Sequence, residues 1–208
     1  MIVSVHAGHN AQGKKGSGAS AILKESVENR KIAKLVVQKL AEYGDMDVYN
    51  HTVDDGTSQQ DVLNRVTNAA NDVGAELMIS IHLNAGGGTG CEAWIWPGNN
   101  GMAQLGETWL HNMEVLGWRN RGVKSSDSLY VLKHSKMNAI LFECGFVDNP
   151  ADADRFDPET FANAIVAAIA TEYGLKHASQ VIEPVKPCGC SCCEDCRRIQ
   201  ECGLLSEE

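Results

Sequence analysis

Four residues combine the side-chain types that metal-assisted hydrolysis needs: His9, Glu25, His82 and Glu143. Two imidazoles and one carboxylate are a recurrent ligand set for catalytic zinc, because they leave the fourth tetrahedral position to a water molecule. A second carboxylate is then spare. Zinc lowers the pKa of a bound water to about 7, and an unligated glutamate can take the proton and return it to a leaving amine. The set therefore predicts hydrolysis of an amide or an ester.

Each of the four residues lies at the end or the start of an expected element. His9 comes just beyond the first strand, and Glu25 is in the opening turn of the helix that follows. His82 is at the end of a later strand, and Glu143 is near the end of another. In a parallel sheet, the carboxyl ends of the strands and the starts of the next helices share one edge, where open α/β sheets bind their ligands. We therefore expect all four side chains at that edge.

Strands that alternate with helices predict an α/β domain with a single twisted, largely parallel sheet flanked by helices. The strands are expected as short runs rich in apolar residues, and the helices as segments with apolar residues at helical spacing. The expected strands cover residues 2–5, 48–51, 77–81, 91–96, 129–132 and 139–144. The expected helices cover residues 25–43, 58–73, 102–116 and 161–173.

Taken singly, these residues have plainer interpretations. Glu25 could be a first-turn acid that the helix dipole favours, and His82 could be a hydrogen-bonded histidine at a strand end. Glu143 follows the apolar run 140–142, where a carboxylate is costly unless it is paired or functional. The prediction of a site therefore depends on the four residues together.

Four short motifs follow one another along the chain. They are Gly8-His9, Leu23-Lys24-Glu25 with Asn29, the run SIHLNA at 80–85 and the run LFECGF at 141–146. In order and interval they resemble the GH, E-x-x-x-N, S-I-H-x-N-A and E-x-G-F motifs of the zinc-dependent N-acetylmuramoyl-L-alanine amidases of type 3. Within that family the chain is most similar to phage endolysins and sporulation amidases. The resemblance covers about residues 1–176.

The resemblance implies one catalytic zinc ion with ligands at His9, Glu25 and His82, and Glu143 as the general base that later acts as the acid. It also implies the substrate, namely the amide bond between N-acetylmuramic acid and L-alanine in peptidoglycan, and a lytic role of the endolysin kind. Two other functions stay open: a zinc hydrolase that acts on a different amide, and a wall-binding module that has lost the reaction. The presence of all four residues speaks against the module.

Two neighbouring residues compete as ligands. His6 lies three residues before His9, at a position where many relatives carry an acidic residue, and the motif favours His9. Glu28 lies three residues after Glu25. At about 100° per residue it is about 300° round the helix, so it is an imperfect substitute.

Cys144 directly follows Glu143, but no Cys–His pair with a recognised spacing accompanies it, so a cysteine nucleophile is disfavoured. Cys91 and Cys144 are instead expected to be small buried apolar residues. Trp94 and Trp96 have two interpretations, either a wall of the substrate groove or part of the core. Arg65 matches a position that is often basic in the family, and it could equally be a solvated helix charge.

The composition limits the partners. A net charge of −9 and a pI of about 5.2 argue against a nucleic-acid binder. No run approaches the roughly 18 apolar residues of a membrane-spanning helix, so no membrane insertion is expected. The sequence MIVSVHAGHN does not resemble a secretory signal. We therefore expect synthesis in the cytoplasm and action on the cell wall after phage-mediated release. The oligomeric state has no sequence signal.

The composition changes near Lys176, which predicts a catalytic domain at 1–176, a linker at 177–187 and a cysteine-rich tail at 188–208. Six cysteines fall between Cys188 and Cys202, and the tail has too few large apolar residues to form a core. Three states of the tail stay open: a second, structural metal ion bound by thiolates, a set of disulfides, or a reduced chain.

Overall fold

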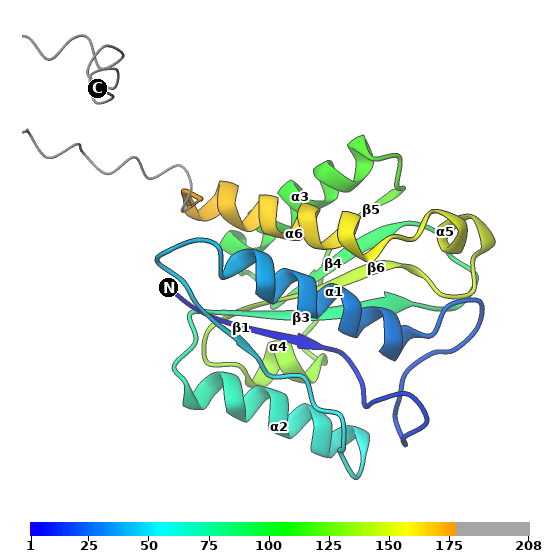
Figure 1. The fold of residues 1–208 in the computed structure, drawn as a ribbon, viewed down its shortest axis with the longest axis horizontal. Helices are drawn as coiled ribbons and strands as arrows, with labels where there is room; N and C mark the ends of the chain where they lie inside the picture. The colour runs from blue at the N-terminus through cyan, green and yellow to red at the C-terminus, as the bar shows by residue number, and fades with distance from the viewer. Residues whose placement is uncertain (178–208) are drawn as a thin grey trace, which may run out of the picture. The chain divides into compact units, whose positions relative to one another are not determined.

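The computed structural model describes residues 1–177, which form a six-stranded sheet with helices on both faces (Figure 1). The strand order is β2-β1-β3-β6-β4-β5, and every neighbouring pair is parallel except the antiparallel pair β4 and β6. The strands are β1 Ile2–Ala7, β2 Asp47–Asn50, β3 Leu77–Asn84, β4 Cys91–Ile95, β5 Asn120–Ser125 and β6 Asn138–Phe146. The expected α/β class with a largely parallel sheet is confirmed.

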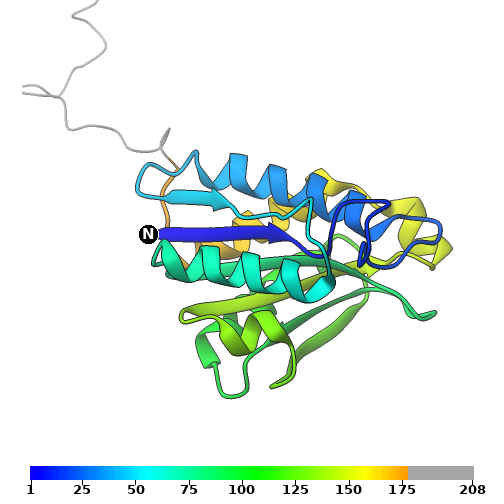
Figure 2. The ribbon, with the colours of Figure 1, turned by 90° about the horizontal axis from the view of Figure 1, so that it is seen from below.

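Helices α1, α3 and α6 cover one face of the sheet, and α2 and α4 lie on the other (Figures 1 and 2). The helices are α1 Glu25–Leu40, α2 Gln59–Asp72, α3 Asn100–Val115, α4 Tyr130–His134, α5 Pro150–Arg155 and α6 Pro158–Tyr173. Among residues 1–177, no helix is long and apolar enough to cross a membrane.

Strand alternation decides which side chains reach each face, because successive residues point to opposite sides of a sheet. In β3, Ile79 and Ile81 pack in the large core with α1 and α6, whereas Met78 packs with α2. In β6, Phe142 joins the large core and Leu141 joins the smaller one. By the same alternation, His82 and Glu143 lie on the α2 and α4 face.

Residues 129–132 were expected to form a strand, and this expectation is wrong because the segment enters helix α4. Ser126 Oγ accepts hydrogen bonds from the N–H groups of Ser128 and Leu129, which turns the chain before the helix begins. Val131 and Leu132 then pack in the smaller core, beside residues of α2, instead of pairing with a strand.

Two elements had no counterpart in the sequence-based expectation. Strand β5 has the sequence NRGVKS and pairs only with β4, so it is an edge strand with little apolar pattern. The short helix α5 begins at Pro150, and the side chain of Asn149 caps it by accepting hydrogen bonds from the N–H groups of Ala151 and Asp152. Apart from His177, the expected linker and the cysteine-rich tail lie outside the described residues, so the domain boundaries and the tail metal stay predictions.

Candidate metal centre

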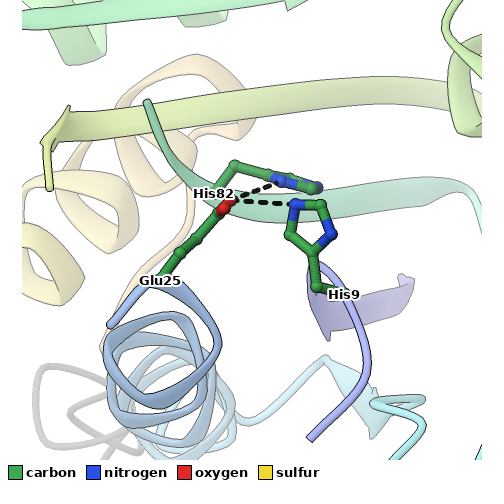
Figure 3. A group of neighbouring side chains, drawn as sticks. All are labelled: His9, Glu25 and His82. Carbon is green, nitrogen blue, oxygen red and sulfur yellow. Dashed lines mark hydrogen bonds and ion pairs between the residues drawn. The ribbon is translucent and has the colours of Figure 1, made fainter. Parts of the chain in front are cut away.

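Three of the predicted side chains meet at the carboxyl edge of the sheet (Figure 3). His9 comes two residues after β1, Glu25 opens α1, and His82 is near the end of β3. Glu25 Oε1 lies 3.1 Å from His9 Nε2 and 3.1 Å from His82 Nδ1. The two imidazole rings are nearly perpendicular, with their centroids 4.9 Å apart. Among the described residues, this is the one group of His, Cys, Asp or Glu side chains close enough to hold a metal ion.

These distances fit a tetrahedral zinc ion. Zinc bonds of about 2.0–2.2 Å to nitrogen and oxygen, at tetrahedral angles, place two ligand atoms about 3.4 Å apart. The observed separations of 3.1 Å are close to that value. The donor set of two imidazoles and one carboxylate is also one that zinc favours.

The protonation states of Glu25 and His82 favour the binding of a metal cation. Burial raises the pKa of Glu25, but hydrogen bonds with His82 and His9 outweigh it and hold that pKa well below the ordinary value. Burial lowers the pKa of His82 by more than the hydrogen bond and the negative charge of Glu25 raise it. The carboxylate is therefore ionised and the His82 imidazole neutral near pH 7, which are the states that coordinate metal.

The backbone around the group leaves little room for movement. A Cβ on Gly8 would overlap the His82 ring at Cε1, and a Cβ on Gly18 would lie 2.5 Å from Glu25 Oε2. His9 has a φ of 67°, in the left-handed region, and Arg30 Nη2 donates to its carbonyl oxygen at 3.2 Å. The clashes that a Cβ would make explain why positions 8 and 18 are glycines.

Glu143 lies next to this group. It pairs in register with His82 of β3, so the two side chains share one face of the sheet. Its Oε2 is buried and has no hydrogen-bond partner among residues 1–177. Burial raises the pKa of Glu143 well above its ordinary value, and the charges of Glu25 and Glu92 raise it further. The carboxyl group is thus disposed to take up a proton.

A cavity of about 470 Å³ is lined by His9, His82 and Glu143. One wall comes from α2, through Gln59, Gln60 and Leu63. Another wall is the segment 128–131, which enters α4. The cavity is large enough for part of a peptide or a sugar to reach Glu143.

The competing ligands do not join the group. His6 is buried, its Nε2 lies 2.9 Å from Ser80 Oγ, and burial lowers its pKa to about 3. Glu28 pairs with Lys31 at 2.9 Å.

The other residues singled out in the sequence lie on the surface or in the core, outside the metal-binding group. Arg65 pairs on the surface with Asp55 at 2.9 Å. Cys91 and Cys144 are both buried free thiols, as expected, and burial raises both pKa values, so neither is a ready nucleophile. Trp94 is half-buried beside the smaller core, and Trp96 is 37% exposed at a separate hollow.

Sequence reasoning missed Glu92, which lies opposite Glu143 on β4. Its side chain is 3% exposed and accepts hydrogen bonds from Asn84, Trp94, Arg121 and Lys124. A glutamate between the apolar residues Cys91 and Ala93 was a usable signal, because an ionised group in such surroundings needs partners. The partners themselves come in part from an edge strand that the sequence pattern did not reveal.

Comparison with known proteins finds similarity to N-acetylmuramoyl-L-alanine amidases. Residues 3–172 match the model of a family described as N-acetylmuramoyl-L-alanine amidase, type 3. The N-acetylmuramoyl-L-alanine amidase CwlM of Bacillus licheniformis is 41% identical over 125 residues, which cover 59% of this chain and 48% of CwlM. The sporulation-specific N-acetylmuramoyl-L-alanine amidase of Bacillus subtilis is 37% identical over 125 residues, with the same two coverages. The chain thus spans about half the length of these curated relatives.

A solved structure shares the fold. The catalytic domain of the CD27L endolysin, which targets Clostridia difficile, superposes with a TM-score of 0.73. It is 25% identical, and the match covers 82% of this chain and 97% of that domain. The similarity therefore extends over the whole α/β sheet and its helices.

Proposed function

The chain belongs to the N-acetylmuramoyl-L-alanine amidase family of type 3, and from this premise we propose that it hydrolyses the amide bond between N-acetylmuramic acid and L-alanine in peptidoglycan. The observation that carries the proposal is the convergence of His9, Glu25 and His82 beside the half-buried side chain of Glu143. Relatives named as amidases at 41% and 37% identity support the choice of bond.

In the proposed mechanism, His9, Glu25 and His82 would hold a zinc ion, which would supply Lewis-acid activation of water and of the scissile carbonyl. Glu143 accepts the proton of the attacking water at its carboxylate and donates it to the nitrogen of the leaving L-alanine. The register of Glu143 with His82 supports this role, because it puts the proposed proton carrier beside a residue of the metal-binding group. The cavity walls from α2 and from segment 128–131 exclude bulk water and orient the substrate.

The experiment is digestion of purified peptidoglycan by the full chain, with and without a chelator. We expect free stem peptides that begin with L-alanine, no new reducing sugar ends, and loss of the reaction in the chelator until zinc is added back. Cuts within the peptide, or activity that survives full metal removal, would contradict the proposal. A synthetic acetylated amide tested in parallel distinguishes a zinc hydrolase of broader substrate range.

Within this activity we propose a lytic role of the endolysin kind, in which the enzyme reaches the wall after release through a phage-made membrane lesion. The likeness to the CD27L endolysin domain supports this role. The test is expression inside a bacterial host with and without a membrane-permeabilising protein. Lysis only in its presence is the expected result, and export of the enzyme without it would contradict the release route.

A further inference from the structure

A buried carboxylate on β4 holds two cations beside the candidate active site. Glu92 Oε2 accepts from Arg121 Nε at 2.6 Å and from Lys124 Nζ at 2.5 Å. Glu92 Oε1 accepts from Asn84 Nδ2 at 3.0 Å and from Trp94 Nε1 at 3.1 Å. We call these five residues the Glu92 cluster. Its carboxylate is fully bonded, so the side chains around it are held in place.

The Glu92 cluster has a net positive charge, because it contains two cations and one carboxylate. One cation is enough to neutralise Glu92, yet both Arg121 and Lys124 pair with it. This surplus occurs in a chain whose net charge is −9. The side chains of Arg121 and Lys124 are 25% and 34% exposed, so both can be reached from solvent. Within residues 1–177, the two terminal nitrogens of Arg121 make no hydrogen bond, which leaves its fork free for an anion.

The strand register places this charge on the same face as the reacting groups. Glu92 is the direct partner of Glu143, and Lys124 is the partner of Trp94. Paired residues of adjacent strands point to the same face of the sheet, and residues two apart on one strand do so as well. His82, Glu143, Glu92 and Lys124 therefore follow one another across that face, from β3 to β5.

The distance between the strands determines which residue of a bound peptide could carry the anion. Adjacent strands are about 4.8 Å apart, so the strand that carries Glu92 is about 10 Å from the strand that carries His82. An extended peptide advances about 3.3–3.6 Å per residue. Two residues cover about 7 Å of this distance. The long side chains of Arg121 and Lys124, whose nitrogens lie 2.6 and 2.5 Å from Glu92 Oε2, cover the rest, so they can meet a carboxylate on the second residue counted from the scissile amide.

We propose that Arg121 and Lys124 bind a free carboxylate on the second residue of the stem peptide, an inference that rests on the amidase function proposed above. The carboxyl group of the muramoyl unit is consumed in the scissile amide, so the anion must come from the peptide. The substrate then lies with its peptide over β4 and β5 and its sugar toward β1 and α2. An enzyme of this kind prefers stem peptides in which that carboxylate is free over those in which it is a carboxamide.

The test uses two soluble muramoyl-L-alanyl peptides that differ only at the second residue, which carries either a carboxylate or a carboxamide. The peptide ends are blocked as amides in both. For the full chain with zinc, we expect kcat/KM to be about tenfold higher for the carboxylate, since hydrogen bonds to charged groups are the stronger ones. Arg121→Ala and Lys124→Ala should each lower kcat/KM for the carboxylate about ten- to a hundredfold, mainly through KM, with little change for the carboxamide.

Two further variants separate binding from folding. Lys124→Arg keeps the charge and should keep most of the preference, whereas Lys34→Ala, an exposed lysine on α1 at the opposite face, should change kcat/KM for neither substrate. Equal kcat/KM for the two peptides in the natural protein would overturn the inference. An equal loss on both peptides in Arg121→Ala and Lys124→Ala would also overturn it, because it would mean that the cations only stabilise Glu92.

A binding measurement keeps this result distinct from failure of the amidase function. Calorimetry with the free L-alanyl peptides needs no turnover, and we expect a Kd about tenfold lower for the carboxylate form. If neither muramoyl peptide is cleaved, the proposed function fails, and the ratio of these Kd values still decides the role of Arg121 and Lys124. Equal Kd values for the two forms would refute it.

Discussion

Glu92 of β4 lies directly opposite Glu143 of β6, and the pKa values of these two carboxyl groups are shifted in opposite directions. Burial raises the pKa of both. Hydrogen bonds from Lys124 and Arg121 more than offset this at Glu92 and lower its pKa. Glu143 Oε2 has no hydrogen-bond partner among residues 1–177, and the pKa of Glu143 is raised well above its ordinary value. Neighbouring acids whose environments separate their pKa values usually have separate tasks. Glu92 is a fixed anion, and Glu143 is the one suited to exchange a proton.

Replacing Glu143 with alanine is expected to abolish turnover but not metal binding. The side chain is outside the group formed by His9, Glu25 and His82, so the ligands are left intact. Loss of a general acid–base group lowers kcat by about 10²–10⁴-fold. Zinc content by elemental analysis and the rate of peptide release check both parts. Glu114→Gln, on the exposed side of α3, is the matched control. A Glu143→Ala protein with full activity would refute the proposed base.

Replacing His82 with alanine is expected to remove both zinc and activity. Its Nδ1 lies 3.1 Å from Glu25 Oε1, and without this imidazole the group keeps only two protein ligands. We expect the purified variant to contain less than about a tenth of the zinc of the natural protein, because each ligand of a catalytic site is needed for tight binding. His111→Ala, which replaces an exposed histidine on α3, should retain zinc and activity. Retention of zinc by His82→Ala would show that the ligand set is different.

Replacing Gly8 with alanine is expected to disturb the metal centre without touching a ligand. The new Cβ would overlap the His82 ring at Cε1, so the ring or the end of β1 must move. Small displacements of positioned groups lower activity about a hundredfold. Zinc affinity and kcat/KM should both fall. Gly44→Ala is the control, because a Cβ added at Gly44 would meet no atom within 4 Å and the residue has no positive φ. Equal zinc affinities for the two variants would contradict the steric argument.

The sequence was sufficient to predict that His9, Glu25 and His82 converge, because each lies where a strand ends or a helix begins. Those positions follow from local periodicity and from the common edge of parallel strands. The Glu92 cluster could not be predicted in this way. It depends on the antiparallel pairing of β4 with β6 and on β5, whose polar sequence carries no strand pattern.

The error at residues 129–132 has a similar cause. The run Leu129, Tyr130, Val131 and Leu132 is equally compatible with a strand or a helix when it is read alone, since short apolar runs do not distinguish the two. The turn made by Ser126 and the packing against α2 decide for the helix. Tertiary contacts thus determined the element where the local pattern was ambiguous.

Replacing Glu92 with glutamine is expected to destabilise the fold at neutral pH and much less in acid. The pKa of Glu92 in the folded protein is below its ordinary value of 4.5, so its contribution to stability is fully present above about pH 4.5. That contribution is lost as the pH falls through the lower, folded pKa, because protonation then removes the same charge that the substitution removes. At pH 7 the substitution leaves Arg121 and Lys124 without their anion, at a cost of about 1–3 kcal/mol in the free energy of unfolding. Denaturant unfolding of both proteins between pH 3 and pH 7 measures the difference, with Glu114→Gln as the control. A difference that stays constant down to pH 3 would show that the ion pairs with Glu92 do not stabilise the sheet.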